Sequence, residues 1–331
     1  MTSLLQRRET QLFLILLLML VFIGIRAPVF FSAQSMDTLL TDLAILAMVA
    51  SVQMLAIMTR GIDLSVAANI ALTGMVTAML SSEFPAMPVW QTVMTALGLG
   101  LMLGTVNAVL IANVGIPPIV VTLGTMSIYR GMVFVVSDGN WVNAHELAEQ
   151  YLGFPIDRFL TLTNIVWISV VLLALLHLFL SRHRHGRELY GLGGNPEAAK
   201  YVGINEKQKL YIVYCLTGMV SGLCGYLWVA RYAVAYTEVA LGFELSTVAA
   251  CVIGGVSMAG GIGTVLGTVL GSAFLVLIFN ALPVINVSPF WQMAISGSVI
   301  LIAVILNSIN DRPQMKVILK KAQLATAKGA A

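Results

Sequence analysis

The chain has 331 residues, of which 59% are hydrophobic and only 10% are charged. Because soluble domains carry roughly 25% charged residues, this composition excludes an ordinary soluble globular protein. The net charge of +3 is small and predicts no nucleic-acid partner.

Apolar stretches recur along the whole chain, and most are near the roughly 20 residues that a helix needs to cross a membrane. They predict an all-α membrane protein of about ten transmembrane helices. The predicted spans lie at roughly 11–28, 40–59, 66–82, 89–112, 118–136, 163–180, 210–230, 246–259, 263–282 and 290–307. The eighth is too short for an ordinary span, so we expect a broken or re-entrant helix there.

The distribution of Lys and Arg predicts the orientation, because these residues stay on the cytoplasmic side. With the N-terminus inside, only Arg26, Arg158 and Arg231 of the 18 fall outside, and Arg130 falls within a span. Both termini are therefore expected in the cytoplasm. We expect one membrane domain over residues 1–310, with a periplasmic loop at 137–162, a cytoplasmic loop at 181–209 and a basic cytoplasmic tail at 311–331.

Polar residues inside the predicted spans are almost all neutral, which suits a pathway for an uncharged, polyhydroxylated solute. Interhelical hydrogen bonding is the alternative for each of them. Arg130 is the one charge that we expect inside a span; snorkelling or binding to backbone carbonyls is the alternative to a pathway role. The pathway candidates are Asn69, Asn107, Thr122, Thr125, Arg130 and Asn280; Gln53, Thr73, Ser127 and Gln292 share their character.

Several kinds of site are not expected. The three cysteines and four histidines lack metal-ligand spacing, so neither a metal nor a cofactor is predicted. The glycine-rich run at 254–263 lies between predicted membrane helices and has no Lys-Ser/Thr, which favours a tight turn over a phosphate loop. No catalytic constellation is evident, so we expect a transport subunit rather than an enzyme.

Residues 195–204 have the pattern of a short helix outside the membrane. Asn195 is a good N-cap, Pro196 fits the first helical position and Glu197 suits the positive end of the helix dipole. Gly203 can end the helix in a left-handed turn. So short a helix is marginal alone in water and needs a surface to dock against. The adjacent Ala198 and Ala199 offer a close contact surface.

This segment resembles the coupling loop of bacterial ABC importer permeases, with Glu-Ala-Ala at 197–199 and glycine at 203. Further motifs resemble the ribose-type monosaccharide permease family: Gly-Ile-Asp-Leu-Ser at 61–65, Ile-Pro-Pro-Ile-Val-Val-Thr-Leu-Gly-Thr at 116–125, Val-Ile-Gly-Gly at 252–255 with Gly-Gly-Ile-Gly at 260–263, and Val-Ser-Pro-Phe-Trp-Gln at 287–292. Within that family, residues 67–74 and 137–146 look most like rhamnose-type permeases, then autoinducer-2 and ribose permeases.

The resemblance implies a multi-pass protein of the bacterial inner membrane that imports a neutral monosaccharide, with rhamnose favoured. It implies a cytoplasmic ATPase subunit, a periplasmic sugar-binding protein and a second permease copy or a related permease. Coupling to the ATPase would fall on Asn195, Glu197, Ala198, Ala199, Gly203 and Ile204.

The outer loop is the expected docking site for the binding protein, through Asp138, Trp141 and Glu146. Its net charge is about −3, and rim charges of this kind act on association rate. Simple solvation of a hydrophilic loop is the alternative. An ion-coupled secondary sugar transporter is the alternative for the whole chain, although it normally needs an intramembrane acidic residue.

Overall fold

The structure is a computed structural model that describes residues 8–284 and the single positions 291, 294, 297, 298, 301 and 305. Most elements of the described residues are helices, and the four strands have two residues each. Residues 1–7, most of the predicted tenth span with Gln292, and the predicted tail at 311–331 lie outside the described residues.

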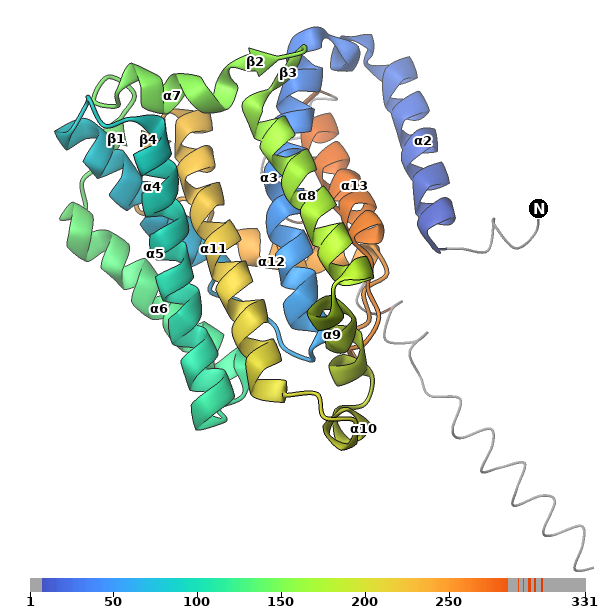
Figure 1. The fold of residues 1–331 in the computed structure, drawn as a ribbon. Coiled ribbons are helices and arrows are strands. Elements are labelled where there is room, and N and C mark those ends of the chain that lie inside the picture. The colour runs from blue at the N-terminus through green and yellow to red at the C-terminus, as the bar shows by residue number, and fades with distance from the viewer. Residues whose placement is uncertain are drawn as a thin grey trace, which may run out of the picture.

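Long helices run between two ends of the molecule (Figure 1). We call the end formed by residues 137–163 the α7 face and the end formed by residues 183–205 the α10 face. The long helices are α2 (Arg8–Arg26), α3 (Ala33–Met58), α4 (Val66–Glu83), α5 (Val89–Val109), α6 (Pro118–Ser137), α8 (Asn164–Arg182), α11 (Glu206–Tyr232) and α13 (Val265–Val284). Two short turns, Pro28–Phe31 and the π-helical Leu110–Val114, join or extend them.

Every predicted span within residues 8–284 coincides with a helix, but the count of about ten is not established. Seven helices of the described range are long and apolar enough to cross a membrane. Helix α4 is not among them, because polar residues such as Asn69, Ser82 and Glu83 lower its mean hydropathy. Helix α3 begins at Ala33, earlier than predicted, because Ser32 caps a polar first turn by accepting from Ser35 N at 3.3 Å.

Helix α12 (Phe243–Ile253) bears out the short eighth span. Its 11 residues reach about 16 Å, roughly half of the hydrocarbon core. The glycine-rich run that follows is a turn, as predicted, with positive φ at Gly255, Gly260 and Gly261. Those angles favour glycine, which has no Cβ to clash.

The core lies around α3, α4 and α11, and glycines set how closely the helices approach. A Cβ at Gly100 or Gly104 of α5 would collide with the backbone of α11 at Gly218 or Tyr214. Gly267 and Gly271 bring α13 equally close to α12. Small residues thus make the close contacts of α5 with α11 and of α13 with α12.

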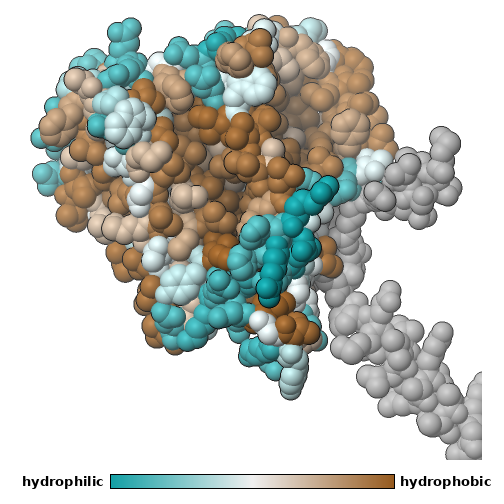
Figure 2. All heavy atoms as spheres, viewed as in Figure 1, coloured by the Kyte–Doolittle hydropathy of each residue, from teal (hydrophilic) through white to brown (hydrophobic). Residues whose placement is uncertain are grey.

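An apolar surface covers the middle of the molecule, whereas hydrophilic residues gather towards the two ends (Figure 2). Exposed apolar residues on α2, α5, α6 and α8 form this surface, including Phe22, Met102, Val135 and Leu175. A soluble protein rarely exposes so large an apolar area, and a bilayer accounts for it.

The α7 face is folded rather than a simple loop. It contains α7 (Glu149–Ile156), a pairing of β1 (Val142–Asn143) with β4 (Val234–Ala235), and a hairpin of β2 (Arg158–Phe159) and β3 (Leu162–Thr163). Tyr151 of α7 is buried, and its hydroxyl bonds Thr77 Oγ1 of α4 at 3.1 Å. Its contact with the bundle explains why this segment is ordered.

Candidate functional site

The short helix predicted at 195–204 is present as α10 (Pro196–Tyr201). Asn195 caps it, since Asn195 Oδ1 accepts from Ala198 N at 3.1 Å. Gly203 has a φ of 80°, and Ile204 N closes the end of the helix by donating to Ala199 O at 3.0 Å. The predicted caps at both ends of α10 are thus confirmed.

The two faces of α10 have different surroundings. Ala199 is buried, and Ile204 lies over Gly191 of the neighbouring helix α9 (Arg184–Gly194). Ala198 is exposed on the outer side. The two alanines therefore do not share one contact surface: Ala199 packs inside the chain, and only Ala198 is free to meet a partner.

Two exposed residues at the end of α10 were missed by the sequence reasoning. Tyr201 is 90% exposed and Val202 is 75% exposed. They lie just after the Glu-Ala-Ala motif. The spacing of apolar residues does not tell whether such a residue is exposed or packed inside, so their exposure could not be read from the sequence. With Ala198 they make up what we call the exposed tip of α10. Helix α10 lies at the end of the molecule opposite α7 (Figure 1). Such a tip is typical of an interaction site.

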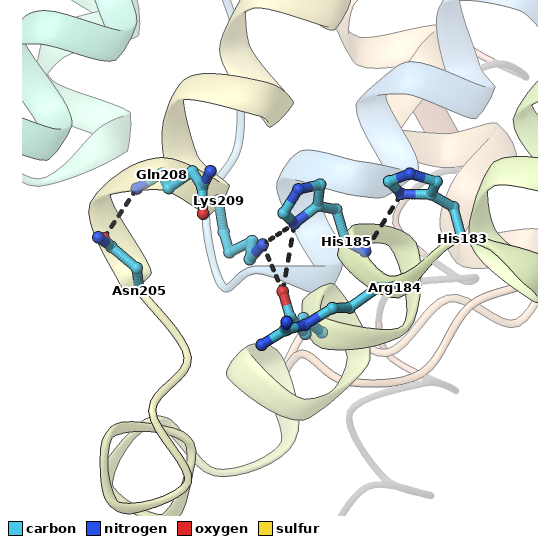
Figure 3. Close-up of polar contacts among 7 residues, drawn as sticks. His183, Arg184, His185, Asn205, Gln208 and Lys209 are labelled. Carbon is cyan, nitrogen blue, oxygen red and sulfur yellow. Dashed lines mark hydrogen bonds and ion pairs between the residues drawn. The ribbon is translucent and has the colours of Figure 1, made fainter.

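An ion cluster around the buried Lys209 joins the two helices that flank α10. Lys209 of α11 is only 1% exposed, and its Nζ contacts Glu188 and His185 of α9 (Figure 3). Glu188 also accepts from Arg184 Nε at 2.6 Å. Hydrogen bonds from Lys209 and Arg184 lower the pKa of Glu188 to about 2. The sequence reasoning counted Lys209 only as one more cytoplasmic charge; its partner comes from another helix.

The buried pathway candidates are hydrogen-bonded within the chain. Asn107 Nδ2 donates to Ser65 Oγ at 2.8 Å, and Thr125 Oγ1 donates to Asn107 Oδ1 at 2.8 Å. Thr122 Oγ1 donates to Ile62 O at 3.0 Å, and Asn69 Nδ2 donates to Gly218 O at 3.2 Å. These bonds link α4, α5, α6 and α11. They agree with interhelical hydrogen bonding, which was the alternative to a pathway role. Whether any of these residues meets a solute stays a prediction.

Asp63 belongs to the same network. It lies between α3 and α4 and is buried, and its Oδ1 accepts from Ser65 N at 2.9 Å and from Ser65 Oγ at 2.6 Å. These bonds form a tight turn that leads into α4, whose N-cap residue is Ser65. Through Ser65, the carboxylate is connected to Asn107.

Arg130 binds backbone carbonyls, one of the alternatives considered for it. Its Nη1 donates to Val239 O at 2.8 Å and to Thr237 O at 3.2 Å, in the irregular segment between β4 and α12. That segment has no helical partners for its carbonyls, and Arg130 satisfies two of them.

The expectation that Arg130 is the one charge inside a span is wrong. Asp42, within the predicted second span, pairs with Arg231 of α11 at 2.8 Å. Asn280 of α13 also donates to Asp42 Oδ2 at 3.2 Å. Asp42 thus ties α3, α11 and α13 together. Sequence patterns missed the pair because its members are 189 positions apart.

The predicted docking residues lie together on the α7 face. Asp138 ends α6 with a φ of 49°. Trp141 is 58% exposed, with its ring 5.5 Å from that of Tyr236. Glu146 accepts from Asn143 N at 2.7 Å, and this bond lowers the pKa of Glu146. Among the described residues, no group of three His, Cys, Asp or Glu side chains could hold a metal ion.

Comparison with known proteins adds an independent observation. The family described as branched-chain amino acid transport system / permease component matches residues 35–304. The chain is 35% identical to the ribose import permease protein of Escherichia coli (strain K12), over 91% of this chain and 94% of that protein. It is 31% identical to the galactose/methyl galactoside import permease protein of Salmonella typhimurium, over 91% and 94%. It is 30% identical to the autoinducer 2 import system permease protein of Salmonella typhi, over 89% and 84%. No solved structure matches the chain.

Proposed function

Because the chain belongs to the family of branched-chain amino acid transport system permease components, we propose that it is the membrane-spanning subunit of an ATP-driven monosaccharide importer. The chain is a multi-pass protein of the bacterial inner membrane. The observation that carries the proposal is α10: a doubly capped helix that projects from the end of an apolar bundle and exposes Ala198, Tyr201 and Val202.

In this proposal the α10 face is cytoplasmic and the α7 face is periplasmic. The first turn of α2 lies at the α10 face, where Thr264 Oγ1 donates to Glu9 Oε1 at 2.6 Å. The basic residues of α8, α9 and α10 lie at that face too, as the positive-inside rule requires of a cytoplasmic surface. The N-terminal end of α2 is then cytoplasmic, and the tenth span predicted at 290–307 would return the chain from the α7 face to the cytoplasm.

The exposed tip of α10 is the proposed contact with a separate ATPase subunit, and the α7 face is the proposed contact with a periplasmic sugar-binding protein. A second permease copy or a related permease completes the transporter. In α10, Asn195, Ala199, Gly203 and Ile204 hold the helix in place. Glu197, Ala198, Tyr201 and Val202 are free to touch the partner.

The test is Ala198→Glu, which puts bulk and charge into the exposed tip without touching the bundle. Membrane insertion and protein level should change little. Uptake into membrane vesicles should fall by at least about ten-fold, with loss of the co-purified ATPase or with ATP hydrolysis uncoupled from uptake. Gln208→Glu is the control, since it adds the same charge to an exposed residue in the first turn of α11, next to the α10 face. Wild-type uptake by Ala198→Glu vesicles with the ATPase bound would exclude α10 as the coupling element.

The proposed substrate is a neutral monosaccharide, with rhamnose favoured by the likeness at 67–74 and 137–146. The similar permeases are named for ribose, galactose or methyl galactoside, and autoinducer 2. These remain the alternatives within the family. Competition uptake tests the choice: a large excess of rhamnose that leaves uptake of the true substrate unchanged would contradict it.

An ion-coupled secondary transporter is the other class of alternative. Its usual requirement is an intramembrane acid that binds the ion. Asp42 is such an acid, but its carboxylate is already paired with Arg231 and accepts a hydrogen bond from Asn280. Uptake that needs ATP and survives collapse of the ion gradients supports the importer, and the opposite dependence supports the alternative.

A further inference from the structure

Arg60 binds the end of the helix that leads into α10. It follows α3 with a φ of 65°, an unfavourable angle for a residue other than glycine. Its Nε donates to Gly193 O at 2.7 Å and its Nη2 donates to Gly194 O at 2.9 Å. These carbonyls belong to the last turn of α9, where a helix leaves its carbonyls without partners. Asn195, the N-cap of α10, comes next in the chain.

The turn between α12 and α13 also contacts Arg60 and the end of α9. Gly261 N donates to Met58 O at 2.9 Å, and a Cβ at Gly193 would collide with that same carbonyl. A Cβ at Gly260 would lie 2.6 Å from Arg60 Cγ. We call this meeting of three backbones the three-way junction; it consists of Met58, Arg60, Gly193, Gly194, Gly260 and Gly261. A Cβ at Gly193 would lie 1.7 Å from Met58 O and 2.6 Å from Gly261 N, so the backbones are in direct contact and cannot move apart or together easily.

From the junction, a hydrogen-bonded route leads into the bundle. Gly61 and Ile62 follow Arg60, and Ile62 O accepts from Thr122 Oγ1 of α6. Asp63 and Ser65 come next, and Ser65 Oγ is bound by Asn107 of α5. A shift of α9 against Arg60 would therefore reach α5 and α6 through a short and buried segment.

We propose that Arg60 is a positioning residue that transmits movement of α10 to the α12–α13 turn and to the buried network at residues 61–65. This inference rests on the proposed function, in which nucleotide binding by the ATPase moves α10. Chain connectivity carries the movement from α10 into α9 and α11. The three-way junction adds a non-covalent connection to α3, α12 and α13, which are far from α10 in sequence. A purely structural role would cap α9 equally in every nucleotide state.

Hydrogen exchange of the assembled permease–ATPase complex separates the two roles. Exchange is compared without nucleotide and with ATP plus vanadate, so no transported solute is needed. In the wild type, we expect nucleotide to change exchange in residues 197–204, in residues 254–264 and in the first half of α6. In Arg60→Gly, the change at 197–204 should persist, while the changes at 254–264 and in α6 fall at least about five-fold.

Arg60→Gly suits this test because glycine adopts the positive φ without strain, so the variant should fold. Arg60→Lys keeps the charge but cannot bind both carbonyls in the same fork, and should also lose most of the distant response. Arg182→Gln is the matched control: it removes one exposed positive charge beside α9, and among the described contacts its side chain has none with the junction.

The outcomes are distinct. A full nucleotide response at 254–264 in Arg60→Gly overturns the inference, and so does a wild type that responds only at 197–204. Equal loss in Arg182→Gln overturns it as well, since the effect is then one of surface charge. If the wild-type permease retains no ATPase, the proposed function is contradicted, and so is this inference, which depends on it.

Discussion

Lys209 and Glu188 form a pair whose members depend on each other. Lys209 is buried, so its charge is tolerated only because Glu188 and His185 lie against it. Arg184, the other partner of Glu188, is 79% exposed and is screened by water. The two contacts of one carboxylate should therefore contribute very unequally to stability.

Glu188→Gln should lower the free energy of unfolding by about 3 kcal/mol, because it leaves the Lys209 ammonium buried without a counter-charge. The double variant with Lys209→Met should recover most of the loss. Arg184→Gln, the matched control, should cost less than about 1 kcal/mol. Thermal unfolding of the detergent-purified protein measures all three; similar losses for the two single variants would contradict the assignment.

The same pair predicts how stability depends on pH. The folded-state pKa of Glu188 is near 2, below its ordinary value of 4.5. A lowered pKa means that the stabilisation is complete above about pH 4.5 and is lost as the pH falls towards 2. Comparing wild type with Glu188→Gln across this range should show their stability difference shrinking only below pH 4.5. A difference already declining at higher pH would contradict the lowered pKa.

Gly203 shows how one backbone angle fixes the end of α10. Gly203→Val places a β-branched residue at a φ of 80°, a strain of about 1–3 kcal/mol confined to this turn. We expect α10 to lose its C-terminal cap and the complex to lose its ATPase on purification. Gly203→Asn is the control, because Asn tolerates the left-handed region, and it should retain most of the ATPase. Equal retention by the two variants would show that the turn does not matter.

At the scale of elements, the contact of α5 with α11 is made by glycines. Gly100→Ala should destabilise the protein by about 1–3 kcal/mol, because its Cβ would collide with Gly218 O. Gly98→Ala lies in the same helix with nothing within 4 Å of its Cβ, and should be neutral or slightly stabilising. Unfolding midpoints of the two variants in one detergent provide the comparison. Equal midpoints would mean that the helices do not approach as closely as described.

At the scale of the whole molecule, the charges of the α7 face should act on an incoming partner. Asp138, Glu146 and Glu149 are exposed there. Replacing all three by their amides should slow association of the sugar-binding protein at low salt, by about ten-fold if steering is strong, and have little effect at high salt. Stopped-flow binding measures the rate. An unchanged rate at low salt would favour simple solvation of this face.

Much of this architecture follows from the sequence itself. Hydropathy placed most membrane helices of the described range within a few residues, because apolar length is dictated by the bilayer. The start of α3 and the end of α12 are the exceptions. The local chemistry of Asn195, Pro196 and Gly203 predicted α10, its caps and its short length, because capping is decided by neighbours in the chain.

Other features were decided only by tertiary structure. The pairing of Asp42 with Arg231, the burial of Lys209 and the binding of Gly193 and Gly194 by Arg60 each join helices far apart in the chain. Ala199 is buried and Ala198 is exposed because of where α9 lies. No pattern of spacing encodes these contacts, because they arise when helices cross and desolvate each other's polar groups. Local sequence therefore determined which segments become helices, and packing determined which of their charges are buried, paired and able to connect one end of the molecule to its interior.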